Sequence, residues 1–228
     1  NTKLVDGIIL MEKIKKDKIM EKIKDENVFK KIVQCSEYIE ENELTYVTID
    51  HKKAAYEAVS HLISIGKKDI YLFSMKKDYT YSTLRREGLI EAMRDNGLEF
   101  KKENEVLLDE LSIKEAQKHM NIILNNREVE NIGIFAVSDV IAIGILKALN
   151  TKNIKIPQEA AVIGFDNIDF SAVTEPSLTT VSQPGYELGA ESVKSLVRKI
   201  TGECNDPEKI ILDHELIVRE TTNKFVLK

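Results

Sequence analysis

Short apolar runs alternate with amphipathic stretches along most of this chain. Ala161–Phe165 is apolar without a period-two alternation, and Asp69–Phe73 reads in the same way, as is typical of strands buried on both faces of a parallel sheet. From Lys52 to Ile65 the apolar residues recur at helical spacing, and Gly66 is placed to end that helix in a left-handed turn. Alternating strands and helices predict parallel sheets with right-handed crossovers, an α/β fold.

The same reading predicts the remaining elements. The other expected strands are Val5–Leu10, Phe29–Val33, Thr45–Ile49, Ile132–Val137 and Ile210–Val218. The other expected helices are Asp17–Asp25, Ser82–Asn96, Ser112–Asn125, Val140–Leu149 and Glu187–Ile200. Gly97 and Gly202 follow two of these helices and are expected to end them. Ser112 and Glu115 have the spacing of a capping box, which predicts a helix start at that point.

Polar residues follow the buried strand Ala161–Phe165. Asp166 and Asn167 come directly at its carboxyl end. Small molecules bind open α/β sheets in the crevice outside the carboxyl ends of the strands, so Asp166 is well placed to accept hydrogen bonds from a polar ligand. Asp-Asn also forms ordinary turns after strands, and the pair alone fits either interpretation.

A longer segment makes the ligand interpretation more specific. Val162–Pro184, which reads VIGFDNIDFSAVTEPSLTTVSQP and is followed by YELGAESV, resembles the C-terminal signature of the effector-binding domain of lactose-repressor/galactose-repressor (LacI/GalR) transcription factors. Further segments follow in that family's order: VDGIIL (5–10), VTIDHKKAAYEAVSHLISIGKKDIYLF (47–73), RREGLIEAM (85–93), IFAVSDVIAIGILKAL (134–149) and ELIVRETT (215–222). Because the family shares its fold with periplasmic sugar-binding proteins, the resemblance indicates architecture more firmly than biological role.

The resemblance implies two Rossmann-like α/β lobes, with parallel sheets flanked by helices, that are joined by three crossover segments. We expect these crossings near Ser74, Ser182 and Asp206. The predicted N-terminal lobe comprises 1–75 and 182–205, the C-terminal lobe 76–181 and 206–222, and the tail 223–228. The resemblance also implies that the DNA-binding headpiece and the first strand–helix units of the N-terminal lobe lie upstream of Asn1, so that this lobe is expected to be truncated, with exposed sheet edges.

Composition and charge narrow the classes of function. Hydrophobic residues make up 43% of the chain and charged residues 31%, and no apolar run approaches the roughly 18 residues of a membrane span. The net charge is −5, and acidic and basic residues are mixed along the chain, so the sequence shows no cluster of positive charge that would bind nucleic acid. Contact with DNA would therefore require another segment, and no membrane contact is expected.

Residues for catalysis or cofactor binding are not grouped in the sequence. Cys35 and Cys204 lie far apart without metal-ligand spacing, and they read as small hydrophobes in a reducing compartment. Four histidines are scattered, and the glycines form neither a P-loop nor a dinucleotide fingerprint. We therefore expect no metal, no cofactor and no enzymatic activity.

Candidate ligand contacts lie at strand ends and on one helix. Sugar hydroxyl groups need carboxylates as acceptors and arginine as a multiple donor. The resemblance implies that Asp50, at the end of the strand Thr45–Ile49, contacts the effector, although Asp50 could instead cap the following helix. It also implies that an arginine three residues before a glycine enters the cleft. Arg85 has this spacing, with Arg86 as the competing candidate.

Arg85 also raises an electrostatic question. It lies in the first turns of its expected helix, where a positive charge meets the unfavourable end of the helix dipole. We therefore expect a negative group nearby to compensate it.

Three further positions follow from the resemblance. Ser138 and Asp139 match a family position that usually carries Asn-Asp. Ser138 is the candidate for direct contact, whereas Asp139 is expected to support the site more often than to touch the ligand, and it can instead cap the apolar helix that follows. Leu111 falls where sugar-responsive relatives place an aromatic ring, so the resemblance allows an apolar contact between Leu111 and the ligand but no aromatic stacking at this position. An aromatic ring that stacks on a sugar would then have to come from elsewhere in the chain. The candidates are Tyr79, Tyr81 and Phe165, although each is more typical of a residue that packs within the protein.

The sequence thus predicts the effector-sensing portion of a cytoplasmic, homodimeric LacI/GalR-type regulator. A sugar or sugar phosphate bridging Asp50 to Arg85 and Asp166 would favour one interlobe angle through its differential affinity. That angle would set the spacing of two DNA-binding headpieces on operator half-sites. The alternative is a periplasmic or lipid-anchored sugar-binding protein of a transport system, which should be monomeric. A sugar-modifying enzyme is a third possibility, and it predicts turnover.

Overall fold

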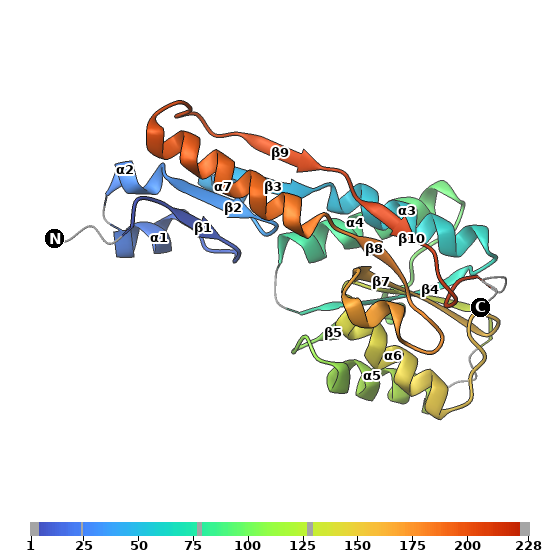
Figure 1. Ribbon diagram of the computed structural model, residues 1–228. Coiled ribbons are helices and arrows are strands. Elements are labelled where there is room, and N and C mark those ends of the chain that lie inside the picture. Colours follow the sequence, from blue (N-terminus) through green and yellow to red (C-terminus); the bar gives the residue numbers. More distant parts are fainter. Residues whose placement is uncertain (1–4, 24, 77–78, 127–129, 224–228) are drawn as a thin grey trace. The chain divides into compact units, whose positions relative to one another are not determined.

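The chain divides into two compact units, each with its own sheet (Figure 1). The computed structural model describes residues 5–23, 25–76, 79–126 and 130–223. Of these, unit 1 contains the residues up to Asp50 and those within 79–81 and 184–213, and unit 2 contains the residues within 51–78, 82–183 and 214–223. The predicted architecture of two α/β lobes with parallel sheets is confirmed.

Unit 1 is built on a parallel sheet with the strand order β1-β2-β3-β9. Its strands are β1 (Ile8–Leu10), β2 (Ile32–Cys35), β3 (Thr45–Ile49) and β9 (Lys209–Leu212). Its helices are α1 (Lys16–Ile23), α2 (Glu26–Phe29), α7 (Gly185–Thr201) and the 3-10 helix η1 (Glu40–Asn42). Ile19 of α1 and Phe29 of α2 pack with Ile32 of β2 and with Leu44 in a buried apolar cluster. This packing is how the unit removes the non-alternating strands from water.

Unit 2 has the strand order β10-β8-β7-β6-β4-β5, in which β10 alone among the described strands runs antiparallel to its neighbour. The strands are β4 (Asp69–Met75), β5 (Glu105–Leu108), β6 (Ile132–Ala136), β7 (Ala160–Asp166), β8 (Thr179–Ser182) and β10 (Glu215–Ile217). The helices are α3 (His51–Ser64), α4 (Thr80–Asp95), α5 (Ile113–Asn126) and α6 (Asp139–Thr151), with the 3-10 helices η2 (Lys102–Asn104) and η3 (Asp169–Ala172). Figure 1 shows α5 and α6 on one face of this sheet and α3 and α4 on the other.

Local signals in the sequence place several helix ends correctly. Gly66, Gly97 and Gly202 have φ values of +89°, +71° and +80°, the left-handed conformation expected after a helix. The hydroxyl oxygen of Ser112 accepts a hydrogen bond from the amide of Glu115 at 3.1 Å, which caps α5 as the spacing predicted.

Two helical glycines allow close helix packing within unit 2. A Cβ at Gly144 of α6 would lie 2.4 Å from the carbonyl oxygen of Ile113, at the start of α5. A Cβ at Gly88 of α4 would lie 2.1 Å from the carbonyl oxygen of Lys52 in α3. Both distances are too short for a real Cβ contact, so α4 is held against the first turn of α3 only because position 88 is glycine.

Some predicted elements differ from the observed ones. Phe29 was expected in a strand but ends α2, and β2 begins at Ile32. The single strand expected over Ile210–Val218 is two strands, because β9 pairs in the sheet of unit 1 and β10 in the sheet of unit 2. Short β5 and β8 were not predicted as strands. Their sheet positions depend on long-range pairing, which a local pattern does not contain.

The boundaries of the units differ from the predicted lobes. Residues 51–75 were expected in the N-terminal lobe, yet α3 and β4 belong to unit 2, where β4 pairs with β5 and β6. The boundaries between the units fall at Asp50–His51, Tyr81–Ser82, Gln183–Pro184 and Asp213–His214, with a further one just before Tyr79, because 79–81 group with unit 1. Of the predicted tail 223–228, only Asn223 lies inside the described residues. In the part of the chain that the structure describes, no helix has both the length and the apolar character needed to cross a bilayer.

Candidate functional site

The candidate site lies at the carboxyl edge of the unit 2 sheet. Parallel strands β4, β6, β7 and β8 all end at this edge. The two strands that follow β4 in sequence, β5 and β6, pair on opposite sides of it, so the strand order reverses at β4. Ligands of open α/β sheets bind at such a switch point, outside the carboxyl ends of the strands.

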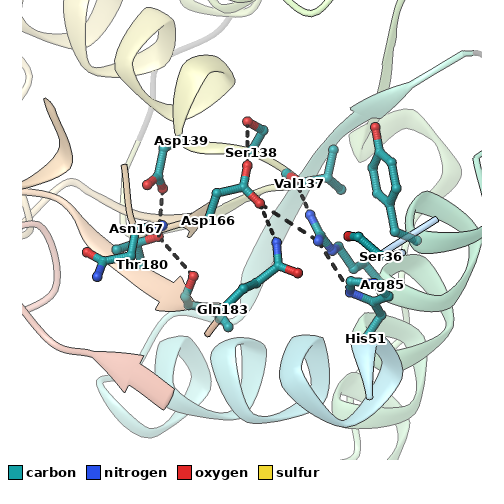
Figure 2. A network of polar contacts seen from close by, with 12 residues as sticks. Ser36, His51, Arg85, Val137, Ser138, Asp139, Asp166, Asn167, Thr180 and Gln183 are labelled. Atoms are coloured by element: carbon teal, nitrogen blue, oxygen red, sulfur yellow. Dashed lines mark hydrogen bonds and ion pairs between the residues drawn. The ribbon is translucent and has the colours of Figure 1, made fainter. Parts of the chain in front are cut away.

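Asp166 is the last residue of β7 and the centre of the site (Figure 2). Its φ is +107°, and that of Asn167 is +51°, a left-handed pair that only a well-supported turn maintains in residues other than glycine. One carboxylate oxygen accepts a hydrogen bond from the Ser138 hydroxyl at 3.0 Å, and the other accepts one from Nε2 of Gln183 at 2.7 Å. The turn therefore directs the carboxylate toward side chains from the ends of β6 and β8.

Arg85 of α4 joins the same cluster. Its side chain is only 3% exposed, and Nη2 lies 3.9 Å from a carboxylate oxygen of Asp166. Nη1 donates to the carbonyl oxygen of Val137, and the guanidinium lies 3.3 Å from the centre of the Phe165 ring. This cation–π contact and the ion pair hold a charge that burial would otherwise disfavour. Within unit 2, Asp166 is a negative group of the kind expected to compensate Arg85.

His51 completes the support of Arg85. Nη2 of the guanidinium lies 3.3 Å from Nδ1 of His51, the first residue of α3. Because a guanidinium has only donors, Nδ1 must accept and is therefore unprotonated. The close approach of α4 to α3 at Gly88 places these two side chains next to each other.

The pKa of the Asp166 carboxyl is raised, first because burial disfavours its charged form. The positive charge of Arg85 and the hydrogen bonds from Ser138 and Gln183 act in the opposite direction. The carboxylate is thus partly desolvated but supplied with donors, a state in which it can exchange these donors for those of a polar ligand.

Asp139 has a structural role different from the expected cap. Ser138 is the N-cap of α6, because its hydroxyl oxygen accepts from the amide of Val140 at 3.3 Å. Asp139 is completely buried, and its two oxygens accept from the Thr180 hydroxyl at 2.6 Å and from the amide of Ile168 at 2.9 Å. The carboxylate therefore ties the turn after β7 to β8 and supports Asp166 from behind. The sequence analysis expected Asp139 to support the site, but the helix cap that it offered for Asp139 falls one residue earlier, at Ser138.

Burial also makes Asp139 titrate near neutrality, which gives a testable pH dependence. Desolvation raises its pKa from 3.8 to about 7, and the charge of Asp166 adds to that effect, whereas Thr180, Ile168 and Arg219 oppose it. Since the folded state favours the protonated form, the free energy of unfolding should fall as pH rises from about 4 to about 7, by about 1.4 kcal/mol per pH unit. Asparagine has the same shape and does not titrate. Relative to Asp139→Asn, wild type should lose about 2.5 kcal/mol between pH 5 and pH 7.5 in urea denaturation.

The control for this measurement is Asp169→Asn, which alters an exposed carboxylate three residues after Asp166. The same comparison with this variant separates the effect of the buried carboxylate from the general effect of an Asp-to-Asn change in this turn. Parallel pH curves for wild type and Asp139→Asn would contradict the role of burial at Asp139.

The structure brings together some of the predicted residues and separates others. Arg85, Ser138 and Asp166 form one cluster, and Asp139 lies directly behind it. Leu111 lies between β5 and α5, is 50% exposed and does not belong to this hydrogen-bonded cluster. Asp50 belongs to unit 1, where it is exposed at the carboxyl end of β3.

The competing candidates are accounted for by other contacts. Arg86 pairs with Glu105 of β5 at 2.6 Å, and its side chain is 42% exposed. Tyr79 and Tyr81 stack on each other with ring centres 5.0 Å apart. Phe165 is fully buried beneath the guanidinium of Arg85. None of these contacts joins Arg86 or either tyrosine to Asp166.

His51, Gln183 and the Val137 carbonyl were not predicted as site groups. Gln183 lies in the segment that carried the resemblance, and its position directly after β8 could have indicated it. His51 follows Asp50 in sequence, but it reaches Arg85 only through the packing of α3 on α4. No local pattern indicates such a contact.

A buried acid, a half-buried acid and a buried arginine meet at the carboxyl edge of a parallel sheet, which is where α/β domains bind small molecules. Comparison with known proteins narrows this class. The family described as periplasmic binding protein-like domain matches residues 59–222. The HTH-type transcriptional regulator RegA of Clostridium saccharobutylicum is 32% identical over 222 residues, which cover 96% of this chain and 65% of that protein.

Solved structures agree with this match. The transcription regulator CcpA of Lactococcus lactis has a TM-score of 0.86 at 27% identity, covering 97% of this chain and 80% of that one. A LacI family transcriptional regulator from Enterococcus faecium with bound ribose has a TM-score of 0.82 at 27% identity, covering 95% and 79%. The chain belongs to the periplasmic binding protein-like domain family. The resemblance predicted from the sequence is confirmed, and the chain spans 65% of the length of the RegA relative.

Proposed function

We propose that this chain is the effector-sensing portion of a LacI/GalR-type transcriptional regulator, and that its effector is a sugar or sugar phosphate. The cluster of Asp166, Arg85 and Ser138 at the switch point of the unit 2 sheet carries the proposal. A carboxylate that already accepts two hydrogen bonds can accept them from ligand hydroxyls, and the planar guanidinium can donate to ring, hydroxyl or phosphate oxygens. The bound ribose in the Enterococcus faecium regulator supports this class of ligand.

The proposed mechanism is a population shift in a homodimer. The effector contacts Arg85, Ser138 and Asp166 of unit 2 and Asp50 of unit 1, with Leu111 as an apolar contact and Asp139 behind the turn. It favours one arrangement of the units only through its differential affinity for that arrangement. In the cytoplasm, two N-terminal headpieces would transmit this arrangement to operator DNA. Neither a cofactor nor a membrane takes part.

Isothermal titration of the chain against D-ribose, cellobiose, ribose 5-phosphate and a purine base tests the proposal. We expect heat with at least one of these compounds. Asp166→Asn, which preserves the shape but removes the charge, should weaken that binding by about tenfold or more, because hydrogen bonds to charged groups are worth about 1.5–3 kcal/mol. Asp169→Asn is the matched control, since this exposed carboxylate lies three residues further along the same turn.

Two results would contradict the proposal. One is the absence of heat with every compound in the panel. The other is equal affinity in wild type and Asp166→Asn, which would place the ligand elsewhere. A monomer in solution would favour the transport-associated sugar-binding protein, and the appearance of a new product during titration would favour an enzyme. The transcriptional regulators among the relatives support the regulator.

A further inference from the structure

Two segments of unit 1 that lie far apart in the sequence enclose a small cavity of about 200 Å³. One segment is α2 with its connection to β2, and the other is the last turn of α7 with the residues that follow it. In the described parts of the chain, no acidic residue lines this cavity, and half of the lining residues are lysines. The lining residues are Asn27, Lys30, Lys31, Lys199, Cys204 and Asn205.

Lys199 is the buried member of this set. It is only 4% exposed, although a lysine is almost never fully buried without a partner. Its ammonium donates a hydrogen bond to the carbonyl oxygen of Asp206 at 3.0 Å. An ammonium has three donors and a full positive charge, whereas a carbonyl oxygen accepts without carrying a net charge. This contact therefore satisfies one donor of Lys199 and leaves its charge without a counter-charge.

The other two lysines add positive charge to the same cavity. Lys31 is half-buried, and Lys30 is exposed. Within the residues that the structure describes, Lys30, Lys31 and Lys199 form no ion pair with a carboxylate. Lys194, on the same helix as Lys199, shows the contrast, because it pairs with Glu191 at 2.6 Å. Three positive charges thus line one cavity without acids to balance them.

Other negative groups of unit 1 do not balance these charges. Lys199 lies in the last turn of α7, and the carboxyl end of a helix carries only about half a unit of negative charge. Asp206 lines a larger neighbouring cavity of about 770 Å³, but it is exposed and forms no ion pair with Lys199. An anion from solution would supply the missing negative charge.

The size of the cavity and its donors favour a small oxyanion. A water molecule takes up about 30 Å³ in the liquid, so a cavity of about 200 Å³ has room for a five-atom ion such as phosphate. Ammonium groups bind phosphate through their charge and their hydrogen bonds. The side-chain amides of Asn27 and Asn205 are further donors for its oxygens.

We propose that the cavity lined by Lys30, Lys31 and Lys199 in unit 1 is a binding site for a tetrahedral oxyanion such as inorganic phosphate. All the residues that line it belong to unit 1, whereas Asp166 and Arg85 belong to unit 2, so this is a second ligand site on the chain. It does not depend on the proposed function. The bound ion stabilises unit 1, because it joins the end of α7 to the connection between α2 and β2.

Isothermal titration with inorganic phosphate at pH 7.5, with ionic strength held constant by sodium chloride, tests the site. We expect wild type to bind phosphate with a Kd of about 1 mM or tighter. Lys199→Met removes the buried charge and keeps a long side chain, so it should weaken phosphate binding about tenfold or more. The variant is expected to fold, because replacing a buried charge with an apolar side chain of similar volume is often neutral or stabilising.

Two further variants complete the test. Lys30→Gln alters an exposed residue of the cavity, which does not endanger folding, and it should weaken phosphate binding about two- to fivefold. Lys194→Met is the matched control for Lys199→Met, because it removes a lysine of the same helix whose side chain is 63% exposed. Lys194→Met should bind phosphate as wild type does.

Nuclear magnetic resonance locates the bound ion. Phosphate should shift the side-chain amide resonances of Asn27 and Asn205 in wild type and leave them unchanged in Lys199→Met. Absence of phosphate binding to wild type, or equal affinity in wild type and Lys199→Met, would overturn the proposal. Phosphate shifts confined to the Nε–H resonance of Arg85 would also overturn it, since they would place the ion in unit 2. Failure of every effector compound would sink the proposed function and leave this test intact.

Discussion

Replacing Arg85 with lysine should weaken effector binding by about 100-fold or more. The guanidinium reaches the Val137 carbonyl, Nδ1 of His51 and the Asp166 carboxylate from one planar group. A lysine ammonium is a single point of charge and cannot take all three directions and still face a ligand. Loss of one or two charge-assisted hydrogen bonds costs about 3 kcal/mol, which corresponds to about two powers of ten in affinity. Titration calorimetry with the effector measures this loss.

Arg86→Lys is the matched control for that experiment. Arg86 lies on the same helix, but it pairs with Glu105 on β5 and is much more exposed than Arg85. Its replacement should leave the affinity within about twofold of wild type, because surface ion pairs contribute about 0–1 kcal/mol to stability and this one does not involve the cluster. If the two variants lost affinity for the effector equally, Arg85 would not have the specific role in binding that is assigned to it.

Replacing Gly164 with alanine should destabilise unit 2 by about 3–5 kcal/mol. Gly164 lies in the buried strand β7, where an added Cβ would be 2.1 Å from a carboxylate oxygen of Asp139 and 3.0 Å from a side-chain carbon of Leu178. Asp139 would have to move and lose its bonds to Thr180 and Ile168, so overpacking and a buried unsatisfied carboxylate add together. Urea denaturation should show the loss as a lower midpoint, and the turn that presents Asp166 should lose its support.

Gly189→Ala controls for the general effect of adding a methyl group to the chain. Gly189 lies within α7, and a Cβ added there would have no atom within 4 Å beyond its own helix backbone and chain neighbours. Alanine at this position should stabilise the protein by about 0.5–1 kcal/mol, because glycine is a poor helix former. If Gly164→Ala were as stable as Gly189→Ala, the packing of Asp139 against β7 would not be as tight as described.

For Arg85, the sequence supported a prediction about charge but not about the partner. Its place near the start of a helix was enough to predict that a negative group compensates it. The sequence did not indicate which acid does so. In the structure, a carboxylate oxygen of Asp166, at the end of β7, lies 3.9 Å from Nη2 of Arg85.

By itself, the sequence determined the local features of this protein. Non-alternating apolar runs predicted the buried strands β4 and β7, and glycines at positions 66, 97 and 202 ended helices, because these signals depend on residues close together in the chain. Tertiary structure alone decided that β9 and β10 pair in different sheets, that Ser138 rather than Asp139 caps α6, and that His51 meets Arg85. These outcomes depend on packing and pairing between distant segments, whose energies are set by three-dimensional neighbours that a local pattern does not specify.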